Sequence, residues 1–242
     1  MGHYNLPEKY RVIDGSTLKM LALITMVIDH FAASVIKYGI LLPRGPVIRG
    51  TNLYTVYLVY KVMRTVGRAA FPIYVFLLVE GFHHTKSRPR YLIRLLIFAF
   101  ISEVPFDLAL KSTFWDMKHQ NVFFELALCL ILLMLWERFK EKPFLQFAAL
   151  GGIALLARYA HFDYGWRGIA LAMVFYAVRD WRIPQAFFGL LVMYFQLPGV
   201  LLGFAPLPFY SGKRGRQLKY FFYAAYPVHL LLFYLLAFYL RS

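Results

Sequence analysis

Long apolar runs alternate with short polar segments along most of this chain. A helix that crosses a bilayer needs about 20 mostly apolar residues, and the pattern supplies about eight such runs, roughly seven to nine. The alternation of polar and apolar residues that marks outer-membrane barrels is absent from the sequence. We therefore predict an all-α, polytopic helical membrane protein. The expected spans are 17–40, 67–83, 91–110, 122–136, 143–160, 165–178, 184–204 and 219–240.

Shorter signals complete this outline. Segment 52–64 is rich in tyrosine and too short to cross, which predicts a short interfacial or re-entrant helix, because tyrosine prefers the headgroup level. Proline and glycine residues across 43–50 indicate a loop, and Ser16 or Thr17 is expected to cap the first span. No linker divides the chain, so we expect residues 1–242 to form a single integral-membrane domain.

Composition agrees with this class, since the chain is 60% hydrophobic and only 16% charged. The single cysteine excludes an intrachain disulfide. The net charge of +15 has two explanations that both stay open. Lysine and arginine gather at helix ends near anionic headgroups, and some basic loops are expected to bind a polyphosphate such as coenzyme A. We expect no nucleic-acid partner, because the basic residues are spread over short loops without a binding motif.

The first span carries Asp29 and His30 near its middle. Each ionisable group at that depth costs about 2.5–3.5 kcal/mol, so such residues usually face a protein interior or a water-filled cavity. A neutral histidine can act as a general base, and a nearby carboxylate stabilises the imidazolium that forms. The alternative is a structural pair between helices. Lys19 precedes His30 by eleven residues, which places both on one helix stripe with a rise of about 16 Å.

Other polar residues in the spans have comparable alternatives. Glu103 and Asp107 share a helix face and either serve the reaction or form an interhelical salt bridge. Glu80 is either functional or interfacial, and His229 either contacts the substrate or is a satisfied core histidine. We predict as catalytic residues His30, Asp29, Glu103 and Glu80, and as substrate-binding residues Lys19, Asp107, Asn121 and His229.

Two kinds of site are not indicated. The histidines lack the spacing of a metal-ligand motif, so we expect no metal site. The Gly-x-Ser-x-Gly elbow of serine hydrolases does not occur. The turn from Gly212 to Gly215, which contains Lys213 and Arg214, is instead typical of a cradle for phosphates.

Five stretches together resemble the TraX family, polytopic bacterial proteins named after an enzyme that N-acetylates conjugative pilin. The stretches are 18–30, 67–85, 91–108, 120–122 and 210–230, and Ser211 departs from the asparagine expected before the Gly-Lys-Arg-Gly turn. The chain is also distantly similar to membrane acyltransferases that acetylate surface polysaccharides. Those proteins carry a basic residue and a histidine on an early span, as Lys19 and His30 do here.

The resemblance implies a multi-pass protein of the bacterial cytoplasmic membrane that uses acetyl-CoA as co-substrate. The expected activity is acetyl transfer to an amine or hydroxyl acceptor, such as a peptide N-terminus, a glycan or a lipid, with His30 as general base. The expected ligands of the coenzyme's phosphates are Arg68, Lys86, Arg88, Arg94, Lys213 and Arg214. Two alternatives stay open: a proton-coupled transporter or flippase, and a non-catalytic assembly factor for a pilus or other surface appendage.

Overall fold

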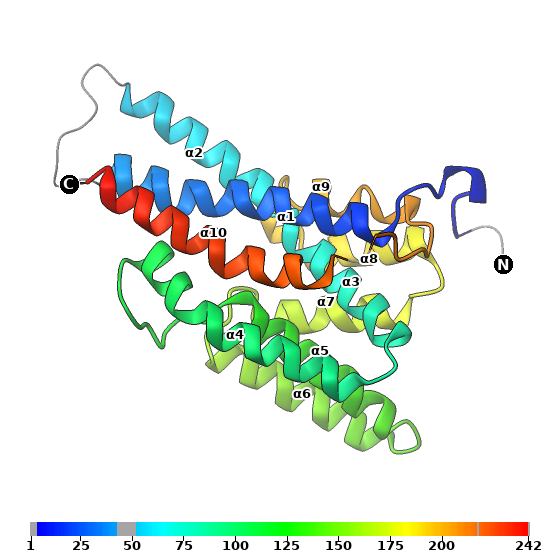
Figure 1. Ribbon diagram of the computed structural model, residues 1–242. Coiled ribbons are helices and arrows are strands. Elements are labelled where there is room, and N and C mark those ends of the chain that lie inside the picture. The colour runs from blue at the N-terminus through cyan, green and yellow to red at the C-terminus, as the bar shows by residue number, and fades with distance from the viewer. Residues whose placement is uncertain (1–3, 43–51, 217, 242) are drawn as a thin grey trace.

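The computed structural model describes residues 4–42, 52–216 and 218–241, and within them the chain is helical apart from turns and one isolated bridge between Ile13 and Tyr210 (Figure 1). The α-helices are α1 (Gly15–Phe31), α2 (Leu53–Gly67), α3 (Ala70–His84), α4 (Arg88–Lys111), α5 (Val122–Arg138), α6 (Pro143–Tyr159), α7 (Trp166–Ala177), α8 (Arg182–Val192), α9 (Leu201–Phe204) and α10 (Lys219–Tyr239). A π-helix, η2 (Ala32–Leu41), continues α1, and short 3-10 turns cover η1 (Glu8–Tyr10), η3 (Tyr194–Gln196) and η4 (Leu207–Phe209).

Three helical segments of the described chain are long and apolar enough to cross a membrane: Gly15–Leu41, Leu53–His84 and Tyr220–Tyr239. Helices α6, α7 and α8 are apolar but shorter, and α4 is long enough but carries six charged residues. The prediction of an all-helical protein with helices suited to a membrane is confirmed. The number of crossings stays a prediction.

The structure differs from the expected separate interfacial helix over 52–64. Helices α2 and α3 are separated only by Arg68 and Ala69, and together they make one apolar segment. The expectation rested on the tyrosine content of 52–64 and on its length, which is too short to cross. Arg64, near the end of α2, forms an ion pair with Asp29 of α1. The loop expected over 43–50 lies outside the described residues.

Helix α1 begins at Gly15, two residues before the expected start of the span at 17. Asp14, and neither Ser16 nor Thr17, caps it by accepting hydrogen bonds from the Thr17 backbone N–H at 2.8 Å and from the Thr17 hydroxyl at 2.9 Å. A carboxylate suits this position because it meets the positive end of the helix dipole. The hydrogen bond from the Thr17 N–H is the main reason why the pKa of Asp14 is lowered.

Helices α1 and α10 lie side by side and run in the same direction, as Figure 1 shows in blue and red. Helix α10 packs against α4, while α3 crosses behind α1 and packs on α7. Large side chains fill the centre without exposure, among them Phe76, Phe82, Leu130, Ile169 and Phe175. Such fully buried aromatic and aliphatic side chains fix the helices in place.

One end of the bundle gathers the starts of α1, α4 and α10 and the end of α3. The segment before α1 is tied there to the loop before α10. The Ile13 N–H donates to the Phe209 carbonyl at 3.0 Å, the Ser211 N–H donates to the Ile13 carbonyl at 2.8 Å, and the Gly15 N–H donates to the Lys213 carbonyl at 2.8 Å. The opposite end holds the end of η2, the end of α4 and the loop between α6 and α7. This arrangement hollows the bundle from both ends.

Candidate functional site

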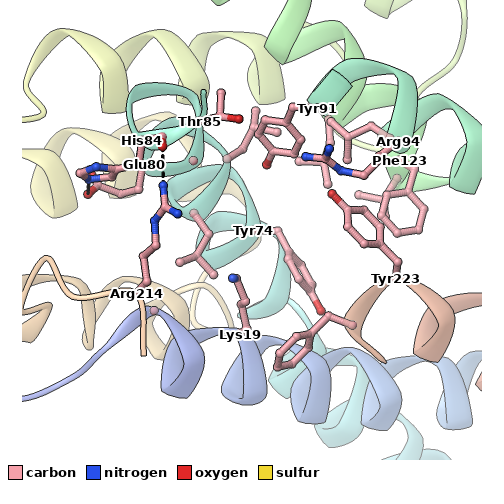
Figure 2. Close-up of a pocket in the computed structure, with 18 of the residues that line it drawn as sticks. Lys19, Tyr74, Glu80, His84, Thr85, Tyr91, Arg94, Phe123, Arg214 and Tyr223 are labelled. Carbon is pink, nitrogen blue, oxygen red and sulfur yellow. Dashed lines mark hydrogen bonds and ion pairs between the residues drawn. The ribbon is translucent and has the colours of Figure 1, made fainter. Parts of the chain in front are cut away.

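A first cavity of about 530 Å³ opens where α1, α4 and α10 begin and α3 ends (Figure 2). Its deeper walls are aromatic and aliphatic. Four basic side chains line it nearer the mouth: Lys19, Lys86, Arg94 and Arg214. A cavity with an apolar interior and several cations at one end favours an elongated ligand with an anionic head.

The basic side chains come from different elements and converge. Lys19 points from α1 into the cavity, and Arg214 extends from the loop before α10 to donate a hydrogen bond to the His84 carbonyl (Figure 2). Arg94 lies between two rings: its guanidinium is 5.6 Å from the Tyr91 ring centre and is hydrogen-bonded to the Tyr223 hydroxyl. Within the described residues Arg94 pairs with no carboxylate, and its Nε is buried without a partner.

A second cavity of about 430 Å³ opens at the opposite end of the bundle. Its lining mixes charges of both signs, unlike that of the first cavity. The charged members are Asp29, Lys37, Arg64, Arg68, Lys111 and Asp163, and His30 joins them from α1. Tyrosine and glutamine side chains add further polar groups to this wall.

His30 is only 9% exposed and pairs with a second histidine. Its Nδ1 lies 2.7 Å from Nε2 of His229 on α10, and the two rings meet edge to edge, with centroids 5.0 Å apart and planes 9° from parallel. The Nδ1 of His229 donates to the Ala225 carbonyl of its own helix at 2.5 Å. The Tyr226 ring meets His30 edge-on at 5.6 Å. His229 is therefore a neighbour of His30, whereas we expected it to contact the substrate.

Asp29 does not hydrogen-bond His30 as the sequence suggested. Adjacent helix residues point about 100° apart, so the two side chains diverge. Asp29 instead accepts a hydrogen bond from Arg64 of α2 at 2.5 Å, in an ion pair whose side chains are 15% and 27% exposed. Gly67 allows this close approach, because a Cβ at that position would overlap the Asp29 side chain.

The two cavities share four lining residues: Met26, Tyr74, Val122 and Tyr226. We call these four residues the septum. His30 lies one helical turn beyond Met26 on the second-cavity side, and Lys19 lies two turns before Met26 on the first-cavity side. The Tyr226 oxygen accepts the Val122 backbone N–H, so its own proton remains available for donation. One stripe of α1 thus connects the two hollows.

Glu80 lines the first cavity, but both of its oxygens are engaged. Arg182 of α8 donates to them at 3.0 and 3.1 Å in a bidentate ion pair. The same guanidinium lies 5.2 Å from the ring centres of Phe76 and of Tyr210. Burial and the nearby Glu80 carboxylate raise the pKa of Tyr210 to about 12. The geometry gives Glu80 a structural ion pair, and we assign it no catalytic part.

Glu103, Asp107 and Asn121, which were predicted as site residues, are not among the residues that line the two cavities. One Glu103 oxygen accepts the backbone N–H of Asn121 at 3.2 Å and its side-chain amide at 2.5 Å. The Asn121 side-chain oxygen caps α5 by accepting the Phe123 N–H at 3.0 Å. Asp107 accepts the Asp116 N–H at 2.7 Å. These residues hold the loop between α4 and α5 in place.

The six predicted phosphate ligands fall into three groups. Lys86, Arg94 and Arg214 line the first cavity, whereas Arg68 lines the second. Arg88 and Lys213 line neither: Arg88 pairs with Glu137 of α5 at 2.5 Å, and Lys213 is exposed in its turn. Gly212 and Gly215 have the positive φ angles of 77° and 65° that the turn requires. In the described part of the chain no group of three potential metal ligands occurs.

Sequence reasoning missed Arg64 and the septum residues. Arg64 was read as the end of an interfacial segment, although a carboxylate in the adjoining span needs a cation partner. That requirement was the signal that could have found it. Tyr74 and Tyr226 carry no such signal, because a tyrosine in an apolar run is more often a packing residue.

Comparisons with known proteins show the family of this chain. A family described as "TraX protein" matches residues 14–237, which include both cavities. A protein of Dichelobacter nodosus named "Probable fimbrial assembly protein FimC, serogroup H1" is 29% identical over 244 aligned positions, which cover 89% of this chain and 92% of the relative. No solved structure matches significantly. The family match extends over most of the chain, and the chain therefore belongs to the TraX family.

Proposed function

We propose that this protein is an integral-membrane acetyltransferase that moves an acetyl group from acetyl-CoA to an amine or hydroxyl acceptor. It would reside in the bacterial cytoplasmic membrane and cross it several times, with about eight spans. The observation that carries the proposal is the position of His30. This imidazole lines the second cavity next to the septum. On the other side of the septum lies the first cavity, which is lined by basic side chains.

The first cavity suits acetyl-CoA. Lys19, Lys86 and Arg94 provide cations for the coenzyme's phosphates, and the apolar walls suit its pantetheine arm. The phosphates would bind near the mouth, since the cations are there. The thioester would then reach the septum along the stripe of α1 from Lys19 to His30, a rise of about 16 Å.

The second cavity suits the acceptor. It opens at the other end of the bundle, and its lining carries charged groups of both signs, including the ion pair of Asp29 with Arg64, so a small polar group would find hydrogen-bonding partners there. Donor and acceptor would approach His30 from opposite ends, and the septum would bring the thioester carbon and the acceptor atom together.

The chemical step follows from these positions. His30 takes the proton of the acceptor amine or hydroxyl while the acceptor atom attacks the thioester carbon. The C–S bond breaks as the new C–N or C–O bond forms, and the imidazolium returns the proton to the departing thiolate of coenzyme A. Tyr226, whose hydroxyl proton is given to no acceptor among the described hydrogen bonds, is the best-placed donor to the oxyanion that develops. Asn121 is engaged with Ala99 and Glu103 and in capping α5, and Lys19 lines the first cavity about three helical turns from His30.

The name of the Dichelobacter relative supports an acceptor that belongs to a surface appendage, such as a pilin-like peptide. The same name also favours a second candidate function, a non-catalytic factor in appendage assembly. The two differ in their need for His30 and for acetyl-CoA. An assembly factor would bind its partners without consuming the thioester.

The test uses the purified full-length protein in detergent or nanodiscs. Acetyl-CoA binding is measured by calorimetry, and release of the coenzyme thiol is followed with cell extract as the source of acceptor. We expect binding, acceptor-dependent thiol release, and a loss of about 10²- to 10⁴-fold in His30→Ala with the affinity for acetyl-CoA retained. Absence of acetyl-CoA binding, or full activity of His30→Ala, would overturn the proposal.

A further inference from the structure

The pairing of His30 with His229 fixes the position of a proton, which the sequence could not reveal. The Ala225 carbonyl can only accept a hydrogen bond, so the His229 Nδ1 that lies 2.5 Å away carries a hydrogen. A neutral imidazole carries one hydrogen, and the Nε2 of His229 is therefore an acceptor. This follows from the hydrogen-bond partners alone.

The same reasoning passes to His30. Its Nδ1 lies 2.7 Å from the accepting Nε2 of His229, so this Nδ1 must donate. The remaining nitrogen of His30, Nε2, then carries the lone pair. It hydrogen-bonds to no described residue, and His30 lines the second cavity. The two rings meet edge to edge with their planes 9° from parallel, and the hydrogen bond between them also holds the imidazole of His30 in one orientation.

We propose that His229 is a positioning residue that holds the reactive tautomer of His30, through a relay from the Ala225 carbonyl to His229 and then to His30. The inference rests on the proposed acetyl transfer. Asp29 was expected to orient His30, but it is bound to Arg64, so His229 does this with an uncharged partner. Histidine acts as base through whichever nitrogen lacks a proton, and the hydrogen bond at the other nitrogen decides which one that is.

Helix α10 supplies the relay from a single turn. Ala225 and His229 are four residues apart, so the side chain reaches back to a carbonyl on the same face. Pro227 lies between them and cannot donate a backbone hydrogen bond, which loosens this turn of the helix. Tyr226 from the same turn packs edge-on against both imidazoles, at 5.6 Å from His30 and 5.8 Å from His229. The relay and the septum therefore share one short stretch of α10.

The test compares substitutions that keep or remove the acceptor at position 229. Glutamine carries both an oxygen that can accept from His30 and an amide that can donate to Ala225, whereas phenylalanine fills the space without either. Thiol release from acetyl-CoA is measured for both variants and for His30→Ala. We expect His229→Phe to lose about 10- to 100-fold in kcat with an unchanged KM for acetyl-CoA, and His229→Gln to recover most of it.

A second measurement does not depend on turnover. Diethyl pyrocarbonate modifies the unprotonated nitrogen of histidine, and peptide mass spectrometry reports modification of His30 by itself. We expect His30 to react several-fold more slowly in His229→Phe than in the wild type or in His229→Gln. Equal labelling of His30 in all three proteins overturns the relay.

The outcomes separate the two proposals. Full activity of His30→Ala would refute the acetyltransferase. Loss of activity in His30→Ala together with wild-type kcat in His229→Phe would leave the acetyltransferase standing and refute the relay. A loss in His229→Phe that glutamine does not restore would also refute the relay, because it would indicate a packing role only.

Discussion

The two cavities differ in how their charges are partnered. In the first, Lys19, Lys86 and Arg94 form no ion pair within the described chain, and the one carboxylate, Glu80, is bound by Arg182. In the second, cations and carboxylates are mixed, and Asp29 is paired with Arg64. Unpaired cations in a partly buried hollow are costly unless a ligand neutralises them. The first cavity, as lined by the described residues, therefore has no carboxylate available to those three cations, whereas the second holds Asp29 and Asp163 beside four cations. This difference supports the proposed anionic ligand in the first cavity.

The largest effect is expected where the two cavities meet. Val122→Phe adds a ring to the septum and would keep the thioester from His30. We expect kcat for acetyl transfer to fall by about 100-fold or more, which approaches the loss expected for His30→Ala. The affinity for acetyl-CoA should stay within a few-fold of the wild-type value. Steady-state kinetics and calorimetry measure both quantities.

Val122→Ala is the matched control, since it enlarges the passage and should retain turnover. Normal kcat in Val122→Phe would mean that the cavities work independently.

A second prediction concerns the second cavity alone. Arg64→Ala leaves the Asp29 carboxylate without its partner in a largely buried position. We expect the free energy of unfolding to fall by about 3 kcal/mol, the lower end for buried pairs because Arg64 keeps 27% exposure. The measurement is the shift of the unfolding midpoint in detergent. The double variant Asp29→Asn/Arg64→Ala should be more stable than Arg64→Ala, and the opposite order would contradict the ion-pair interpretation.

A third prediction concerns the first cavity alone. Removing a cation by Lys19→Ala or Arg94→Ala should weaken acetyl-CoA binding about 10-fold each, because a charge-assisted hydrogen bond contributes about 1.5–3 kcal/mol. The effect should shrink at high salt. Calorimetry at two salt concentrations provides the comparison.

Lys111→Ala in the second cavity serves as the control and should leave the affinity for acetyl-CoA unchanged. If Lys111→Ala weakens acetyl-CoA binding as much as Lys19→Ala does, the assignment of the acetyl-CoA site to the first cavity is wrong.

The smallest effect is expected at the edge of the first cavity. Asp14 caps α1, and its pKa is lowered chiefly by the Thr17 backbone N–H. Asp14→Ala should cost about 1 kcal/mol at neutral pH. Because the folded-state pKa lies below the unfolded one, this stabilisation is complete above about pH 5 and is lost on acidification below about pH 4.

Thermal unfolding of wild type and Asp14→Ala, measured at neutral pH and again below about pH 4, checks this prediction. Asp14→Asn serves as a capping control. A difference between wild type and Asp14→Ala that grows on acidification would show that the sign is wrong.

The helix pattern could be predicted because long apolar runs are a strong signal. The expected spans 143–160 and 165–178 coincide closely with α6 and α7. The tyrosine-rich segment 52–64 was expected to be separate from the span after it. The local pattern could not show that Arg64 pairs with Asp29 of α1 and that α2 and α3 form one apolar segment. Ion pairs between helices are therefore the main source of error in such predictions.

The site could be predicted only in part, for a similar reason. His30 and Lys19 share a stripe as the helix period requires, and each lines a cavity. The contact of His30 with His229 depends on α1 and α10 running side by side, which the sequence of neither helix determines. Glu103 was predicted to act in the site because a buried carboxylate is unusual. Its partner, the cap residue Asn121, lies in a loop that has no periodicity.

In the proposed membrane arrangement, a helix bundle with a cavity at each end also has to prevent ions from passing through it. The four septum residues, Met26, Tyr74, Val122 and Tyr226, line both cavities. In that arrangement, their thioether, isopropyl and phenol groups would offer little to a hydrated ion, so the septum would also limit ion leakage. In the proposed reaction, the pantetheine arm of acetyl-CoA would pass between the septum side chains and block this passage while it is bound. The same side chains would then both separate the two cavities and enclose the arm.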